Sequence, residues 1–226
     1  MKKYLSVIFT ILLLFIFMGC VSNKVEETPE NLTIQELILS GRSDEARRLF
    51  QTKTDINGTD EDGNTALHIA AIVNDYDLIN FLIYMGANTE IKNNSGDTPL
   101  HIAIKNNSVK AAEILAALYG NIFAKDGNGI TALELGIKRG TTFYDSLITQ
   151  KTGVLVDGQG QSIVHYFVQW KDTDALAVCI RKGLPVSVED IYGVTPLDIC
   201  YRDSNDIVSV QMAASLLLAG AAPKRG

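Results

Sequence analysis

The sequence predicts an all-α solenoid of about six stacked helix-turn-helix units, including caps, joined by short β-hairpin loops. Three observations predict this fold. A pattern that begins with glycine recurs at Gly63, Gly96, Gly129, Gly160 and Gly193, spaced by 33, 33, 31 and 33 residues. A Thr or Ser that can cap a helix follows each glycine by two residues, and apolar residues then continue at helical spacing. A helix pair this short cannot bury its apolar face alone, so the units must stack.

Residues 1–19 have the plan of a secretory signal peptide, with Lys2 and Lys3 before a mainly apolar run that ends near Gly19. The run of about fifteen residues is shorter than the roughly 20 that span a bilayer, so a tilted, uncleaved anchor is the alternative. The end of the run, "FMGC", resembles the lipobox of bacterial lipoproteins, although Phe17 and Met18 depart from its usual pattern. That resemblance implies cleavage before Cys20 and the attachment of fatty acyl chains, such as palmitate, to this cysteine, which would anchor the protein in a membrane.

Residues 20–30 are expected to be the lipidated cysteine and a flexible polar tether, because they show no apolar periodicity. Val21 stands where an aspartate retains many lipoproteins of enteric-type bacteria at the inner membrane. The lipoprotein resemblance therefore favours the outer membrane, on its periplasmic side or at the surface. The chain without residues 1–19 has a net charge of −8 and no run of Lys or Arg. We expect no binding to nucleic acid through bulk charge.

The repeat domain is expected to cover residues 31–226. Its most regular copies, "GNTALHIAA" from Gly63 and "GDTPLHIAI" from Gly96, have a 33-residue Thr-Pro-Leu-His-x-Ala pattern that resembles the ankyrin repeat. The first and last units are expected to be caps, since one lacks this motif and the other has a stretched turn. The fourth is two residues short and has Gly136 at the alanine position, so a local defect in the stack is expected there. The approximate units are 31–60, 61–93, 94–126, 127–159, 160–192 and 193–226.

The three histidines are predicted to be structural. His68, His101 and His165 occupy the same position of their own repeats, and stacked helices lie roughly 8–10 Å apart. Equivalent positions therefore cannot meet at one metal ion, and no metal or cofactor is expected. The ankyrin resemblance implies that this histidine bonds the threonine of the turn and nearby main chain, which gives Thr65 and Thr98 a structural role as well.

No arrangement in the sequence predicts catalysis. No Ser or Asp is accompanied by a base in a form that suggests a triad, and "DGNG" at residues 126–129 lacks the lysine of a phosphate-binding loop. We therefore expect neither an enzyme nor a small-molecule substrate. Cys179 and Cys200 are interpreted as small buried residues, with a disulfide between them left open.

The ankyrin resemblance implies that partners bind at the concave face, formed by hairpin tips and the exposed side of the first helix of each unit. Trp170 and Tyr192 are the predicted anchors, because binding hot spots favour aromatic residues. The alternative for Trp170 is that it fills space left by the irregular fourth unit. The full set of candidate partner-binding residues is Trp170, Tyr192, Arg139, Lys138, Asp62, Asn64, Asn94, Asp97, Ile130 and Arg202.

The sequence thus predicts a module tethered to the cell envelope that binds an unidentified protein partner in its concave groove and reaches the membrane through its N-terminal lipid. Two alternatives remain: an inhibitor or accessory subunit of an envelope enzyme, and a secreted factor that interacts with a host.

Overall fold

The computed structural model describes residues 32–52, 54–118 and 120–223. The predicted signal peptide, the lipidation site Cys20 and the tether lie outside these residues. Within the described ranges the regular elements are helices, and the only β structure is three isolated bridges at the bases of hairpins. The predicted all-α solenoid is confirmed.

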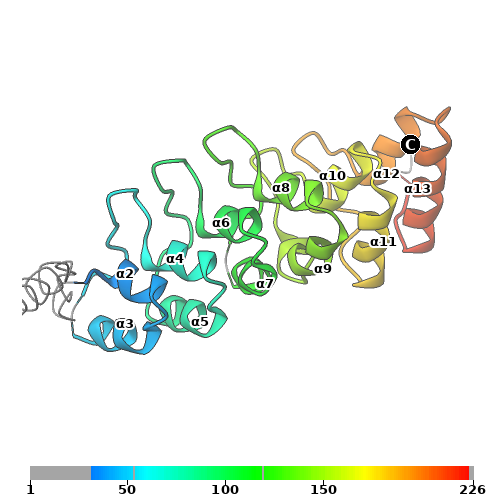
Figure 1. The fold of residues 1–226 in the computed structure, drawn as a ribbon. Coiled ribbons are helices and arrows are strands. Elements are labelled where there is room, and N and C mark those ends of the chain that lie inside the picture. The colour runs from blue at the N-terminus through cyan, green and yellow to red at the C-terminus, as the bar shows by residue number, and fades with distance from the viewer. Residues whose placement is uncertain (1–31, 53, 119, 224–226) are drawn as a thin grey trace, which may run out of the picture.

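The helices lie in two rows, with the hairpins projecting from the inner row (Figure 1). The inner row contains α2 (Ile34–Leu39), α4 (Ala66–Ile72), α6 (Pro99–Lys105), α8 (Ala132–Lys138), α10 (Ile163–Gln169) and α12 (Pro196–Arg202). The outer row contains α3 (Ser43–Phe50), α5 (Tyr76–Tyr84), α7 (Val109–Ala117), α9 (Tyr144–Leu147), α11 (Thr173–Arg181) and α13 (Ile207–Leu218).

The inner helices begin where a side chain can cap them. At α6, the Thr98 hydroxyl accepts a hydrogen bond from the backbone N–H of His101, and Pro99 occupies the first helical turn. The proline lacks an N–H that would be unpaired at this position, and its φ suits a helix. Reciprocal capping of this kind recurs at α4, α8 and α12, which explains why each helix starts three residues after its glycine, directly after the capping threonine.

The core runs along the line where the two rows meet. Ala70 and Ala103 are fully buried, and their small side chains let α4 and α6 pack closely. Leu78, Leu82 and Leu115 of the outer helices are also fully buried. Each pair therefore buries its apolar face against its neighbours, as the short helices require.

The fourth unit departs from this plan. Its outer helix, α9, has four residues where α5 and α7 have nine, and it lies between two 3₁₀ turns, η2 (Thr141–Phe143) and η3 (Thr152–Val154). Leu147 fills the space beside Gly136, since a Cβ at residue 136 would lie 2.1 Å from Leu147 Cδ1. The local defect expected from the shortened repeat is present.

The fifth unit has the opposite irregularity. Phe167 of α10 occupies the register position of Ala70 and Ala103, and its ring is fully buried. A ring fits here because α8 and α10 approach each other less closely than the other neighbouring inner helices do. The volume missing at Gly136 and the volume added at Phe167 lie on opposite sides of one junction.

The two ends of the stack differ in polarity. The first outer helix, α3, carries Arg42 at its start and acidic and basic residues along its length, whereas the last, α13, leaves Ile207 and Leu218 exposed. No described helix has both the length and the apolarity needed to cross a bilayer.

Cys179 and Cys200 are buried, as predicted from the sequence. Both are free thiols, so the disulfide that the sequence left open is not formed in this structure. Burial raises the pKa of Cys179 to about 12 and that of Cys200 to about 11. Neither sulfur is a reactive thiolate at neutral pH.

Candidate binding surface

Five hairpin turns form the rim of the inner face, and each is closed by one carboxylate or amide. At the fourth, Asp157 Oδ1 accepts hydrogen bonds from the backbone N–H groups of Gln159 and Gln161, both at 2.8 Å. The glycine three residues after the acceptor has φ between 69° and 80°, a conformation that favours glycine. The sequence reasoning missed these acceptors, although an Asp or Asn three residues before every repeat glycine is a readable signal. They are Asp60, Asn93, Asp126, Asp157 and Asp190.

Backbone hydrogen bonds link neighbouring turns into a rigid rim. In each case the second residue of a turn donates its N–H to the carbonyl of the third residue of the preceding turn. The pairs are Asn94 to Asp62 at 3.0 Å, Gly127 to Ser95 at 3.2 Å, and Ile191 to Gln159 at 2.9 Å. The same backbone hydrogen bond therefore joins the neighbouring turns at three of the four junctions.

The histidines form a second line of links inside the stack. Nδ1 of His68 accepts from the backbone N–H of Thr65 at 3.1 Å, which places the ring proton on Nε2. Nε2 then donates to the carbonyl of Asp97 in the next unit at 3.0 Å. His101 and His165 make the same bonds to Ile130 at 3.3 Å and Val194 at 3.0 Å. Burial lowers the pKa of His68 and of His101, which favours the neutral ring that these bonds require.

Other residues take the histidine position in the remaining units. In the first unit Glu36 takes the histidine position, and the side-chain amide of its neighbour Gln35 donates to the carbonyl of Asn64 at 3.2 Å, so Gln35 supplies the bond that the histidine makes elsewhere. In the fourth unit, Glu134 accepts from the backbone N–H of Thr131 at 3.2 Å but, as a carboxylate, has no proton to donate onward. The junction between the fourth and fifth units therefore lacks this link.

One predicted contact residue, Asp97, is not available at the surface, and the expectation that it lines the groove is wrong. Its side chain is 5% exposed and lies 2.5 Å from the Lys105 ammonium, which also contacts Asp126 at 3.1 Å. Burial alone would lower the pKa of Lys105, but its hydrogen bonds to the two carboxylates outweigh that effect and raise it. Lys105 thus neutralises two buried carboxylates, which sequence reasoning could not pair because they come from different turns.

Two predicted amide contacts are also used within the rim. Asn64 is half-buried, and its Oδ1 accepts from the Asn93 side-chain amide at 2.9 Å. Asn94 is exposed, but its side-chain amide donates to the carbonyl of Glu61 at 2.9 Å. Both amides hold neighbouring turns together, so their role as partner contacts stays a prediction and a partner would meet them already hydrogen-bonded to the rim.

Trp170 lies against other aromatic rings. It is half-buried, with its ring centroid 5.2 Å from that of Tyr166 and 6.1 Å from that of Phe167. This is the space-filling arrangement that the sequence left open as the alternative to an anchor. Ile130 is also half-buried.

The remaining predicted contacts are exposed. Tyr192, at the tip of the last turn, is 76% exposed, and Arg139 donates to the carbonyl of Lys105 at 2.8 Å while its side chain stays accessible. Asp62, Lys138 and Arg202 are exposed as well. The accessible part of the inner face is therefore acidic near the first turn, basic at the fourth unit, and aromatic with a cation at the C-terminal end.

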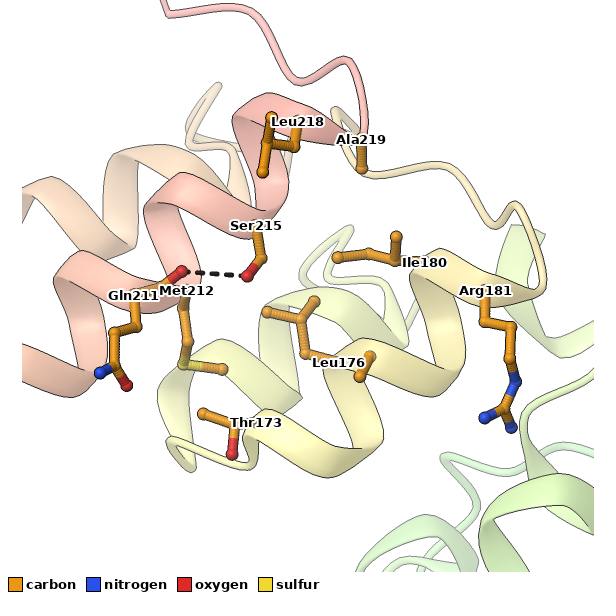
Figure 2. Close-up of a pocket in the computed structure, with 10 residues that line it drawn as sticks. Thr173, Leu176, Ile180, Arg181, Gln211, Met212, Ser215, Leu218 and Ala219 are labelled. Atoms are coloured by element: carbon orange, nitrogen blue, oxygen red, sulfur yellow. Dashed lines mark hydrogen bonds between the residues drawn. The ribbon is translucent and has the colours of Figure 1, made fainter.

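A hollow of about 530 Å³ lies elsewhere, between the outer helices α11 and α13. Figure 2 shows Leu176 facing Met212 and Ile180 facing Ser215 across it, while Ser215 donates to the backbone carbonyl of Gln211 at 3.0 Å. Arg181 is the single charged residue of the lining, so no acid–base pair meets there. Within the described ranges, no group of three or more His, Cys, Asp or Glu side chains is placed to hold a metal ion.

Comparison with known proteins agrees with this geometry. A family model described as ankyrin repeats (three copies) matches residues 18–126 and 73–153, which together are more than half of the chain. No curated protein matches the sequence.

Proposed function

Because the chain belongs to the ankyrin-repeat family, whose repeats indicate a protein–protein interaction module, we propose that this protein is tethered to a bacterial cell envelope and binds a protein partner along its concave inner face. The binding step involves no reaction and no cofactor. The interaction module follows from the family; the tether, the face and the partner are the proposal.

The rigid inner face is the observation that carries the proposal. On either side of the junction between the fourth and fifth units, backbone bonds between turns and histidine bonds between units hold the exposed side chains in one arrangement before any partner arrives. A surface that is already ordered loses little conformational entropy on binding. Tyr192 and Arg202, both exposed at the C-terminal end, belong to residue types that often dominate binding energy.

The tether rests on the sequence of the first twenty residues. Two lysines, an apolar run and the final Gly-Cys support export, cleavage and acylation at Cys20. Multiple acyl chains on one residue would hold the protein stably at a membrane. Its position in the outer membrane is inferred from Val21 alone.

Proximity cross-linking in living cells tests the partner. A photoreactive residue replaces Tyr192, and a matched control replaces Tyr84, which is 88% exposed on the outer helix α5. We expect one dominant protein adduct from position 192 and not from position 84. Identical adducts from both positions would contradict binding at the inner face.

Metabolic labelling with an alkyne fatty acid tests the anchor separately. We expect the fatty-acid label on the wild-type protein and none on the Cys20→Ala variant. The variant should no longer be recovered in the membrane fraction. An exported protein that is never labelled and is recovered from the medium would favour the secreted factor. A single envelope enzyme at fixed stoichiometry in the cross-linked complex would favour the inhibitor or accessory subunit.

A further inference from the structure

One junction along the rim lacks the bond that joins the others. By the register of the three observed pairs, the N–H of Gly158 should meet the carbonyl of Asn128 between turns 126–129 and 157–160. Among the described residues, neither group has a hydrogen-bond partner. We call this place the split junction.

The glycines show that the two turns stand apart. A Cβ added at Gly96 would lie 2.5 Å from the next turn, and one at Gly160 would lie 2.9 Å from the next. At Gly129 and Gly158, which face the split junction, an added Cβ would meet nothing within 4 Å. The separation coincides with the missing histidine-type link at Glu134 and with the wider packing of α8 and α10.

A hollow of about 370 Å³ lies at the split junction. Its walls include Phe123 and Tyr166, whose rings stack with centroids 5.4 Å apart, and the exposed side chain of Val156. The Asp157 carboxylate is already used, because Oδ2 accepts from the Tyr166 hydroxyl at 2.7 Å and Oδ1 closes the turn. Lys125 is the single cation of the lining.

We propose that an extended segment of the protein partner binds at the split junction and supplies the missing backbone pairing. The segment accepts a hydrogen bond from the Gly158 N–H and donates one to the Asn128 carbonyl, as an added strand does at a sheet edge. An apolar side chain of the segment enters the hollow against Phe123 and Tyr166, and an acidic neighbour faces Lys125. This inference rests on the proposed protein-binding function and names a site for it.

Gly158 offers a clean test, because it is the second residue of a turn closed by the Gly160 N–H to the Asp157 carbonyl at 3.0 Å. Proline suits this position of a turn, and the N–H that it removes bonds no described residue. Gly158→Ala is the matched control, since it keeps the N–H and its Cβ meets nothing.

The probe is a phage-displayed library of random linear peptides selected against the full-length protein. Enriched peptides are titrated against the isotope-labelled protein by NMR, and Kd is measured for both variants. We expect a shift and slowed hydrogen exchange at the Gly158 amide, a Kd unchanged in Gly158→Ala, and a Kd about three- to tenfold weaker in Gly158→Pro, as the loss of one hydrogen bond predicts.

Three results would overturn the inference. Enriched peptides that bind both variants equally and leave the Gly158 amide unshifted would mean that peptides bind elsewhere. A Gly158 amide protected before any peptide is added would mean that the chain itself covers the split junction. If no peptide is enriched, the split junction is not a peptide-binding site. Cross-linking at position 192 would still test the proposed function independently.

Discussion

Phe167→Ala restores the residue type that the regular repeats carry, yet we expect it to destabilise the protein. In an ordinary repeat an alanine at this position permits close helix packing. Here the ring of Phe167 is fully buried, and it contacts Trp170 with centroids 6.1 Å apart. Removing a buried phenylalanine ring costs about 3–5 kcal/mol, because the transfer energy of the ring is lost and a cavity remains.

The assay is thermal and urea unfolding followed by circular dichroism. For a chain of this size the loss corresponds to a fall in Tm of about 6–20 °C. Tyr84→Ala, which trims a side chain that is 88% exposed, is the control and should stay within about 0.5 kcal/mol of the wild type. A Phe167→Ala protein as stable as the control would refute the argument that the ring fills a widened junction.

Three further outcomes are expected. Gly136→Ala should lower the free energy of unfolding by about 1–3 kcal/mol, because the new methyl group overlaps a buried leucine; a gain in stability would contradict this. Lys105→Met should cost about 1–3 kcal/mol by leaving two buried carboxylates without their cation, whereas Lys110→Met, at an exposed ion pair, should cost less than about 1 kcal/mol in the same urea titration. The free energy of unfolding should fall as the pH drops below about 6.5. In that range His68 and His101 bind protons in the unfolded chain but stay neutral in the folded protein, because folding lowers their pKa. Each histidine contributes a slope of at most about 1.4 kcal/mol per pH unit. Replacing both histidines by Asp, the residue that caps α12 in the same way, should flatten this dependence, and an unchanged slope would exclude the histidines as its cause.

The regular units could be predicted from the sequence because their determinants are local. A positive-φ glycine, a capping Thr and helical spacing all act within nine residues, so the starts of α4 and α6 follow from short stretches of chain. The carboxylates and amides that close the turns are equally local. They stand three residues before the repeat glycine and therefore lie outside the stretch from glycine to helix that predicts the fold.

The surroundings of the predicted contact residues could not be predicted from the sequence, because they depend on side chains of the neighbouring unit. Asp97 is buried by Lys105 and by the stack around it, and the amides of Asn64 and Asn94 are taken up by adjacent turns. These partners lie a repeat length or a helix away. A position that varies among repeats can therefore be a link between units as well as a contact for a partner.

The irregular features of the fourth and fifth units have one origin. Two residues fewer in the fourth unit leave α9 with four residues, and Leu147 then occupies the space beside Gly136. With α8 and α10 less closely packed, the ring of Phe167 fills the interior of the gap, while the turns above it separate and leave the Gly158 N–H unpaired. The same shortening that weakens the repeat pattern in the sequence thus opens the rim at one place. At this junction, which aromatic rings fill inside and which is open at its rim, the proposed partner segment would meet a Gly158 N–H and an Asn128 carbonyl that bond no other described residue.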